Sequence, residues 1–399
     1  MKQLIASDIA SAMANASWIR RMFEAGNELR HTRGAANVFD FSLGNPDVPP
    51  PAKTRAVLHA LADDVVRPCG LGYIPNAGLP AFREALAQRL SRQQQVALEG
   101  KHLIVTVGAA GALVAFFRAV LEAGDEVIVP APYFVEYGFY CGHFGGHLRP
   151  VPMQGPDFAL DVDQLLAAVT ERTRVVLLNS PNNPTGAIYS AEALQRLAAT
   201  INRLNETRER PIFILSDEPY RLFAFDGATV PPILPLSPTA IVLGSFSKSL
   251  SLAGERIGYM AVNPALEGVD TLLAAVTMTN RTLGFVNAPI LGQQLAMALL
   301  DEQVDLSIYD ARRHAMARVL TEAGFEFSLP RGAFYFFPKA PGGDDLALVE
   351  KLMAEGIIAV PGRGFGVPGY IRLCCAVEQS IIERSAPAFK AAMKALVKA

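Results

Sequence analysis

The most informative stretch of the chain is Leu243-Gly-Ser-Phe-Ser-Lys248-Ser-Leu-Ser-Leu-Ala-Gly-Glu-Arg256-Ile-Gly-Tyr259. It overlaps an apolar run, Ala240–Ser245, which has the pattern of a buried strand. Lys248 follows that strand among hydroxyls and small residues, and it is the only lysine between Lys101 and Lys339. An amine shielded from water has a lowered pKa and can form a Schiff base. Taken alone, a lysine beside a serine-rich turn is more often a solvated loop residue, so the rest of the sequence must decide.

Around this stretch, residues 102–262 alternate between short β-branched runs and longer helical ones. The runs are almost continuously apolar, which suits strands buried on both faces of a sheet. Strands that alternate with helices predict an α/β domain with a largely parallel sheet, whose ligand binds at the carboxyl ends of the strands. The expected strands are Leu103–Val107, Glu126–Pro130, Arg174–Asn179, Pro211–Ser216, Ala240–Ser245 and Arg256–Val262, with helices such as Gly111–Glu122 and Ala191–Leu204 between them.

The two ends of the chain have a different pattern. Residues 1–45 and 306–399 carry helices with shorter strand-like pieces, and Pro46–Pro51 is a stiff, extended connector. We therefore expect a three-layer α/β/α large domain with a mostly parallel sheet at residues 46–305, and a smaller α+β domain built from both chain ends. The strand-like pieces are Ala333–Phe337, Ile357–Val360 and Tyr370–Cys374.

Three further strand ends carry polar or small residues. Ser216-Asp-Glu-Pro-Tyr220 brings together an acid and a phenol, which suit a protonated pyridine nitrogen and a phenolate. Asn179-Ser-Pro-Asn-Asn183-Pro-Thr-Gly186 supplies amides before a tight turn. Thr106-Val-Gly108-Ala-Ala-Gly111 runs from a strand into a helix, whose first N–H groups suit a phosphate. Each feature alone is more often an ordinary turn. Four of them at four strand ends predict one ligand site.

The composition argues against several other classes of protein. With 36 basic and 38 acidic residues the net charge is −2, which does not suit a surface that binds nucleic acid or an anionic membrane. The four cysteines form neither a disulfide framework nor a zinc spacing, and His143 and His147 lack a third ligand, so no metal site is predicted. The sequence has no leader pattern and no apolar run of the ~20 residues that a membrane span needs. We expect a soluble, cytoplasmic protein.

The four motifs, in this order, resemble those of the class I and II pyridoxal-phosphate-dependent aminotransferases, which have the aspartate aminotransferase fold. The combination of S-x-S-K…R-x-G with N-P-T-G and D-x-x-Y is highly specific, and the resemblance covers nearly the whole chain. It implies pyridoxal 5′-phosphate as cofactor and a transaminase that exchanges an amino group between an L-amino acid and a 2-oxo acid in a ping-pong cycle. Further matching segments are Ser42–Asp47, Tyr73, Gly78–Glu84, Pro330–Tyr335 and Pro361–Arg372.

The resemblance implies a role for each residue around the cofactor ring. Lys248 would form the Schiff base and, once freed by substrate, shuttle a proton. Asp217 would keep the ring nitrogen protonated, so that the ring can accept electrons. Asn183 and Tyr220 would bond the 3′-oxygen of the ring and lower the pKa of the Schiff base. Phe134 would stack on the ring, at a position where many relatives have Trp or Tyr.

The same resemblance assigns the phosphate group and predicts a dimer. Backbone groups at the helix start and three side chains would hold the phosphate. Tyr73 matches a tyrosine that reaches the phosphate from the neighbouring subunit, which implies a homodimer with shared active sites. The residues expected around the phosphate within one chain are Gly108, Ala109, Ala110, Ser245, Ser247 and Arg256.

Substrate recognition is expected to depend chiefly on Arg372. It matches the arginine that grips the α-carboxylate in a bidentate pair, with Asn183 and the backbone of Gly44 assisting. Arg281 lies near the position where dicarboxylate-specific relatives carry a second arginine from the partner, but one residue out of register. The lysine that some other relatives place after the phosphate turn is replaced here by alanine and glycine. These differences favour neutral or varied amino acids as substrates.

Two other functions are compatible with parts of this pattern. The same lysine and cofactor support β-elimination or decarboxylation, because the pocket selects which bond breaks. A lyase would release pyruvate and ammonia while its cofactor stays an aldehyde. A non-catalytic sensor is the second alternative, but the first 35 residues are too short and too weakly basic for a DNA-binding module.

Overall fold

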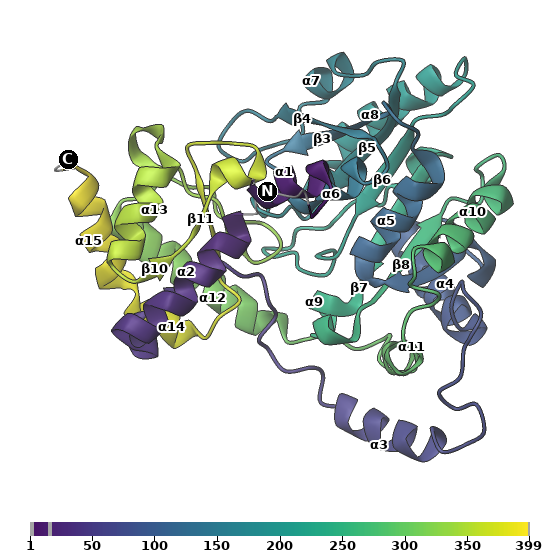
Figure 1. The fold of residues 1–399 in the computed structure, drawn as a ribbon, viewed down its shortest axis with the longest axis horizontal. Helices are drawn as coiled ribbons and strands as arrows, with labels where there is room; N and C mark the ends of the chain where they lie inside the picture. Colours follow the sequence, from purple (N-terminus) through teal and green to yellow (C-terminus); the bar gives the residue numbers. More distant parts are fainter. Residues whose placement is uncertain (1–3, 15–17, 398–399) are drawn as a thin grey trace.

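The computed structural model describes residues 4–14 and 18–397, and its centre is a seven-stranded sheet (Figure 1). The strands lie in the order β2-β8-β7-β6-β5-β3-β4, and β8 runs antiparallel to both of its neighbours. The remaining neighbours pair in parallel, so the expected largely parallel sheet is confirmed. Their bounds are β2 Leu103–Val107, β3 Glu126–Ala131, β4 His147–Pro152, β5 Thr173–Asn179, β6 Phe213–Asp217, β7 Ala240–Ser245 and β8 Ile257–Val262.

Helices cover both faces of this sheet, because its strands send buried side chains to alternate sides. In β5, Val175 and Leu177 pack into one hydrophobic cluster, and Val176 and Leu178 pack into the other. The first cluster contains α5 Gly108–Val120, α6 Glu136–Gly142 and α10 Val269–Thr282. The second contains α4 Pro80–Gln94, α7 Val162–Ala167, α8 Ala191–Asn205 and α11 Ile290–Ala298.

The two ends of the chain meet beside this large sheet. Strand β1 (Phe39–Asp40) pairs in parallel with β10 (Ile357–Ile358), which joins an N-terminal strand to a C-terminal one. A second small sheet has the order β11-β12-β9, in antiparallel pairs. Its strands are β9 Tyr335–Phe336, β11 Val360–Pro361 and β12 Ile371–Cys374, and the helices at the chain ends are α1 Ser7–Ala14, α2 Trp18–Arg33, α12 Leu306–Ala323, α13 Asp345–Ala354, α14 Gln379–Arg384 and α15 Ala386–Val397.

Two further helices differ in where they lie. In Figure 1, α3 (Thr54–Asp64) lies on the periphery, after the proline-rich connector. By contrast, α9 (Phe246–Ser249) follows β7 directly. Within the described residues no helix combines the length and the apolar character that crossing a membrane requires.

The sequence-based boundaries differ from the structure in a few places. The edge strand β4 was not expected, and the piece Ile357–Val360 is divided between β10 and β11. Arg256, expected to open β8, instead precedes it with a left-handed backbone (φ +54°). This conformation turns the chain between α9 and the strand, so Arg256 lies beside the carboxyl end of β7, which pairs with the start of β8.

Candidate active site

A cavity of about 290 Å³ lies at the carboxyl ends of β5, β6 and β7. The start of α5 and residues of the C-terminal sheet close it on other sides, as expected for a ligand site in a parallel α/β fold. Twelve of the fifteen predicted site residues line it: Gly44, Ala109, Ala110, Phe134, Asn183, Asp217, Tyr220, Ser245, Ser247, Lys248, Arg256 and Arg372.

Lys248 stands in α9, immediately after β7. Ser245 caps this helix by accepting a hydrogen bond from the backbone N–H of Ser247, which fixes the turn that presents the lysine. The Lys248 Nζ donates to the carbonyl oxygen of Gly44 at 2.6 Å and lies 5.6 Å from the centre of the Phe334 ring. Burial, together with the nearby charge of Arg372, lowers the pKa of Lys248 to about 8. An amine with this pKa is partly neutral, and therefore nucleophilic, near neutral pH.

Asp217 ends β6 and is buried on the cavity wall. Its Oδ2 accepts a hydrogen bond from the hydroxyl of Tyr137 at 2.5 Å, whereas its Oδ1 has no partner among the described residues. Burial raises the pKa of Asp217 to about 7, against the lowering effect of the Tyr137 bond. A buried carboxylate with one open oxygen fits a protonated ring nitrogen, because a positive charge there would restore its ionised form.

Asn183 and Tyr220 flank this acid on neighbouring strand ends. The backbone N–H of Asn183 donates to Asn179 Oδ1 at 2.8 Å, and Asn179 Nδ2 donates to the carbonyl oxygen of Asp217 at 2.9 Å. The hydroxyls of Tyr220 and Tyr335 lie 2.8 Å apart. These bonds hold the polar side chains of β5 and β6 in one fixed arrangement.

The other end of the cavity is built to receive an anion. Helix α5 begins at Gly108, and a Cβ atom at this position would lie 2.6 Å from Arg256 Nη2, so only glycine lets the arginine come this close. The hydroxyls of Ser245 and Ser247 bond each other at 2.8 Å. The first N–H groups of a helix, two hydroxyls and a guanidinium are together the chemistry of a phosphate site.

Arg372, in β12, is buried between two aromatic rings. Its guanidinium carbon lies 4.9 Å from the centre of the Tyr335 ring and 4.8 Å from that of Phe365. It donates through Nη1 to Asn183 Oδ1 at 3.1 Å and through Nη2 to the carbonyl oxygen of Ser42. Its Nε has no partner among the described residues. A buried arginine with an open donor beside a cavity suits a carboxylate ligand.

Three predicted residues do not line the cavity. Gly108 lies directly behind it, against Arg256. Tyr73 is 93% exposed and Arg281 is exposed as well, so neither reaches the site within its own chain. Both remain predictions for a neighbouring subunit.

Sequence reasoning missed seven of the residues that line the cavity, and three of these are tyrosines. Tyr137 donates a hydrogen bond to Asp217, and Tyr335 shares one with Tyr220. Tyr137 and Tyr335 are far in the sequence from their partners Asp217 and Tyr220, so only the three-dimensional structure brings them to the site. The other missed lining residues are Leu113, Tyr140, Asn179, Pro219 and Ala253.

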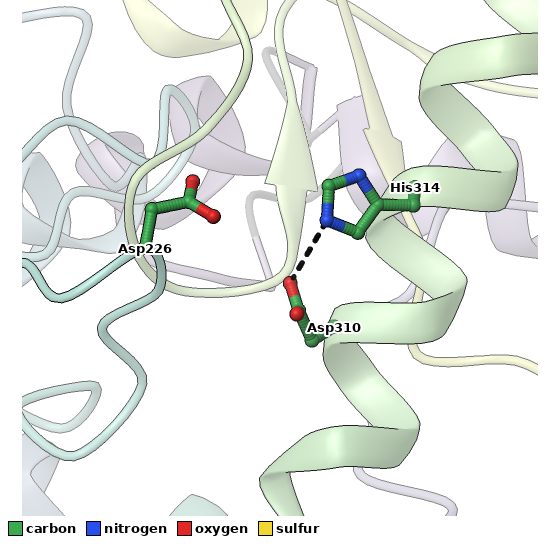
Figure 2. A group of neighbouring side chains, drawn as sticks. All are labelled: Asp226, Asp310 and His314. Carbon is green, nitrogen blue, oxygen red and sulfur yellow. Dashed lines mark ion pairs between the residues drawn. The ribbon is translucent and has the colours of Figure 1, made fainter.

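A second polar cluster lies outside this cavity. Figure 2 shows Asp310 and His314 on one helix, α12, with Asp226 facing them from a loop; the His314 Nε2 lies 3.6 Å from Asp310 Oδ1. Their oxygens and nitrogen could surround a metal ion. Arg313, however, pairs with Asp226 and with Asp310 at 2.8 Å each, so the two carboxylates already neutralise a buried guanidinium. This cluster is therefore an ion-pair network that ties α12 to the loop.

Comparison with known proteins finds a matching family model and similar proteins over most of the chain. The family model described as aminotransferase class I and II matches residues 36–389. An aspartate/prephenate aminotransferase of Thermus thermophilus is 32% identical over 91% of this chain and 92% of its own length. An asparagine–oxo-acid transaminase of Streptococcus mutans is 30% identical over 90% and 92%. The crystal structure of an amino transferase from Eubacterium rectale superposes with a TM-score of 0.94, at 36% identity over 99% of each chain.

Proposed function

The chain belongs to the class I and II aminotransferases, and from this premise we propose how its own residues perform the reaction. The protein is a pyridoxal-phosphate-dependent transaminase that exchanges an amino group between an amino acid and a 2-oxo acid. When bound, the cofactor supplies an aldehyde that takes up the amino group and a ring that accepts electrons from the substrate's Cα. The proposal concerns which side chains hold it and which move protons.

We propose that Lys248 is the residue that anchors the cofactor's aldehyde carbon and later moves the substrate's Cα proton on its Nζ. Two features support this role. Its lowered pKa keeps part of the amine neutral near neutral pH, and the Gly44 carbonyl holds the Nζ at the cavity wall. A neutral amine can both attack a carbonyl and accept a proton.

Asp217, Asn183 and Tyr220 would hold the ring. The open Oδ1 of Asp217 would pair with the ring nitrogen and hold its proton. Asn183 and Tyr220 would donate to the oxygen on the ring, and Phe134 would cover one ring face. Ser245, Ser247, Arg256 and the backbone of Gly108, Ala109 and Ala110 would hold the phosphate. The carboxylate of Asp217 matches a cationic ring nitrogen, and the guanidinium of Arg256 matches a dianionic phosphate. This match of charges supports the proposed orientation of the cofactor in the cavity.

Arg372 would bind the substrate's α-carboxylate, assisted by Asn183 and Gly44. Its guanidinium is already oriented by two aromatic rings and two hydrogen bonds, which reduces the entropy lost on binding. Lys248, Arg256 and Arg372 are the cationic side chains among the residues that line the cavity. Two of them would hold the cofactor and the third the α-carboxylate, so none would be left to bind a second carboxylate. We therefore propose that amino acids with neutral side chains are the preferred substrates, unless Arg281 of a partner subunit adds a charge.

We also propose the assembly and location of the protein. Leu71, Tyr73 and Leu291 are exposed and line one surface hollow, which supports a homodimer in which Tyr73 enters the neighbouring site. The four cysteines are all unpaired, which supports the reducing cytoplasm. We propose residues 46–305 as the large cofactor-binding domain, and residues 1–45 and 306–399 as the small one. The pairing of β1 with β10 supports this division.

The single observation that carries the proposal is the half-buried amine of Lys248, which shares one cavity with the open oxygen of Asp217 and the open Nε of Arg372. The test uses the cofactor-loaded enzyme and one amino acid without any oxo acid. We expect one 2-oxo acid per site and conversion of the bound cofactor to its amine form. Lys248→Ala should produce none, and the exposed Lys390→Ala should behave as wild type.

Other outcomes would contradict the proposal in distinguishable ways. Repeated release of oxo acid and ammonia, with the cofactor still an aldehyde, would identify a lyase instead. Full turnover by the Lys248→Ala variant would show that another group moves the proton. Performing the reaction with each of the twenty common amino acids would then identify the preferred donor.

A further inference from the structure

The hydroxyl of Tyr335 meets that of Tyr220 in the wall of the cavity. The two oxygens lie 2.8 Å apart, and both rings are buried and stand nearly perpendicular, with centres 5.7 Å apart. Tyr335 comes from β9 of the C-terminal sheet, and Tyr220 follows β6 of the large sheet. The contact therefore joins the two parts of the fold at the ligand site.

The position of Tyr335 is tightly constrained. Gly44 passes so close that a Cβ atom there would overlap the Tyr335 hydroxyl. The guanidinium of Arg372 lies over the Tyr335 ring. Among the described residues, the Tyr335 hydroxyl has one hydrogen-bond partner, Tyr220. Tyr335 thus has little freedom to point its hydroxyl anywhere else.

Only one of two facing hydroxyls can donate the bond between them. In the ligand-free cavity, either direction leaves one hydroxyl proton without an acceptor among the described residues, and a buried unpaired donor is unfavourable. With the cofactor's ring oxygen beside Tyr220, as the proposed function has it, donation by Tyr335 is the direction that leaves neither proton unpaired. If Tyr335 donates, the proton of Tyr220 is free for an acceptor in the cavity. We propose that Tyr335 is a positioning residue that donates to Tyr220 and thereby directs the Tyr220 proton into the cavity, toward the cofactor's ring oxygen.

This inference rests on the proposed function, in which Tyr220 donates to the ring oxygen of the cofactor. A hydroxyl that accepts a hydrogen bond becomes a stronger donor, because bonds in a chain polarise one another. Stronger donation stabilises negative charge on the ring oxygen. It therefore lowers the midpoint pH at which the visible absorbance of the lysine-bound cofactor titrates. Loss of the Tyr335 hydroxyl should move that midpoint upward.

The test is a pH titration of the visible absorbance in the cofactor-loaded wild type, Tyr335→Phe, Tyr220→Phe and the double variant. Phenylalanine keeps the ring against Arg372 and removes only the hydroxyl. From cooperative strengthening of about 10–30%, we expect Tyr335→Phe to raise the midpoint by about 0.2–0.6 pH unit and Tyr220→Phe to raise it more. In the Tyr220→Phe background, the second change should add no shift.

Tyr309→Phe is the matched control. Tyr309 is buried in the same aromatic cluster, with its ring centre 5.6 Å from that of Phe334, and its hydroxyl does not contact Tyr220 or Tyr335. This variant should leave the midpoint unchanged. Melting temperatures of the cofactor-free proteins verify that each variant folds, and Tyr335→Leu provides a second variant without the hydroxyl, expected to shift the midpoint in the same direction.

Each result is decisive. An unchanged midpoint in Tyr335→Phe, or an equal shift with and without the Tyr220 hydroxyl, would overturn the inference. Failure of the proposed function would look different, because wild type itself would then show no titrating visible band. Tyr335→Leu also removes the ring beneath Arg372, so its KM for amino acids should rise, whereas that of Tyr335→Phe should stay within about twofold of wild type.

Discussion

Lys248 and Arg372 bring two kinds of positive charge into the same cavity. An arginine stays charged at every physiological pH, so it suits a group that must always bind a carboxylate. A lysine loses its proton readily when burial disfavours the charge, and here burial brings its pKa down to about 8. The chain keeps a single lysine between Lys101 and Lys339, at the position where loss of a proton is part of the proposed chemistry.

The first prediction concerns the titration of Lys248 in the cofactor-free protein. Because its pKa is lowered to about 8, the neutral amine should increase as pH rises through 8 and reach a plateau above pH ~9. The rate at which an amine-reactive reagent labels Lys248, followed by peptide mass spectrometry, measures this. The ordinary pKa of a lysine side chain is 10.5, so a lysine in a short unstructured peptide serves as the reference. A rate that still rises steeply between pH 9 and 10 would show that the amine is not shielded.

The second prediction concerns the guanidinium of Arg372. Arg372→Ala should raise KM for every amino-acid substrate by on the order of 10²-fold, because a bidentate, charge-assisted pair is lost. Arg372→Lys retains the charge but loses the planar fork, so its KM should lie between those of the alanine variant and wild type. Steady-state kinetics with several donors measure both variants. Equal KM values in all three proteins would place the carboxylate elsewhere.

At the scale of elements, the sequence predicted the buried strands best. The predicted bounds of β2 and β7 agree with the structure, because continuous apolar runs between turn residues mark strands buried on both faces. The edge strand β4 escaped notice, since His147–Pro152 contains polar residues and two prolines and is largely exposed. The lining of the site by Tyr137 and Tyr335 was also unpredictable, because it depends on which distant elements the fold brings together.

The close approach of α5 to β8 is sensitive to a single added atom. A Cβ at Gly258 would lie 2.6 Å from the backbone nitrogen of Ala109, at the start of the helix whose N–H groups face the cavity. We therefore predict that Gly258→Ala lowers the free energy of unfolding by about 1–3 kcal/mol, the usual cost of overpacking. Urea denaturation measures stability, and fluorescence titration measures cofactor affinity, which should fall as well.

Gly142→Ala is the matched control for this change. A Cβ at Gly142, the last residue of α6, would meet no other atom within 4 Å among the described residues. The variant should be as stable as wild type or slightly more stable, since alanine loses less backbone entropy in a helix. If Gly258→Ala and Gly142→Ala unfold at the same urea concentration, the close contact between α5 and β8 does not limit stability.

At the scale of the whole molecule, the proposed dimer can be tested by mixing two inactive variants. If Tyr73 acts in the neighbouring site, a heterodimer of Lys248→Ala and Tyr73→Ala has one site with both residues intact. Statistical exchange of subunits in a two-fold symmetric dimer should then restore about a quarter of wild-type activity. Mild denaturation and refolding of the mixture, followed by an activity assay, measures the gain.

Controls make this complementation specific. Each variant refolded alone should stay at its own low activity, and Lys248→Ala mixed with Arg372→Ala should gain nothing, because both residues belong to the same chain's cavity. No recovery in the first mixture, although size-exclusion chromatography shows dimers, would mean that Tyr73 does not act in the neighbouring site.

The contact between Arg372 and the carbonyl of Ser42 joins residues 330 positions apart in the chain. During synthesis the ribosome must therefore release nearly the whole polypeptide before the carboxylate-binding end of the cavity can form. The sheet strands from β2 to β8 are complete long before that and can fold first. A nascent chain stopped before β12 should already hold the phosphate-binding turns, yet it would have no means of recognising an amino acid.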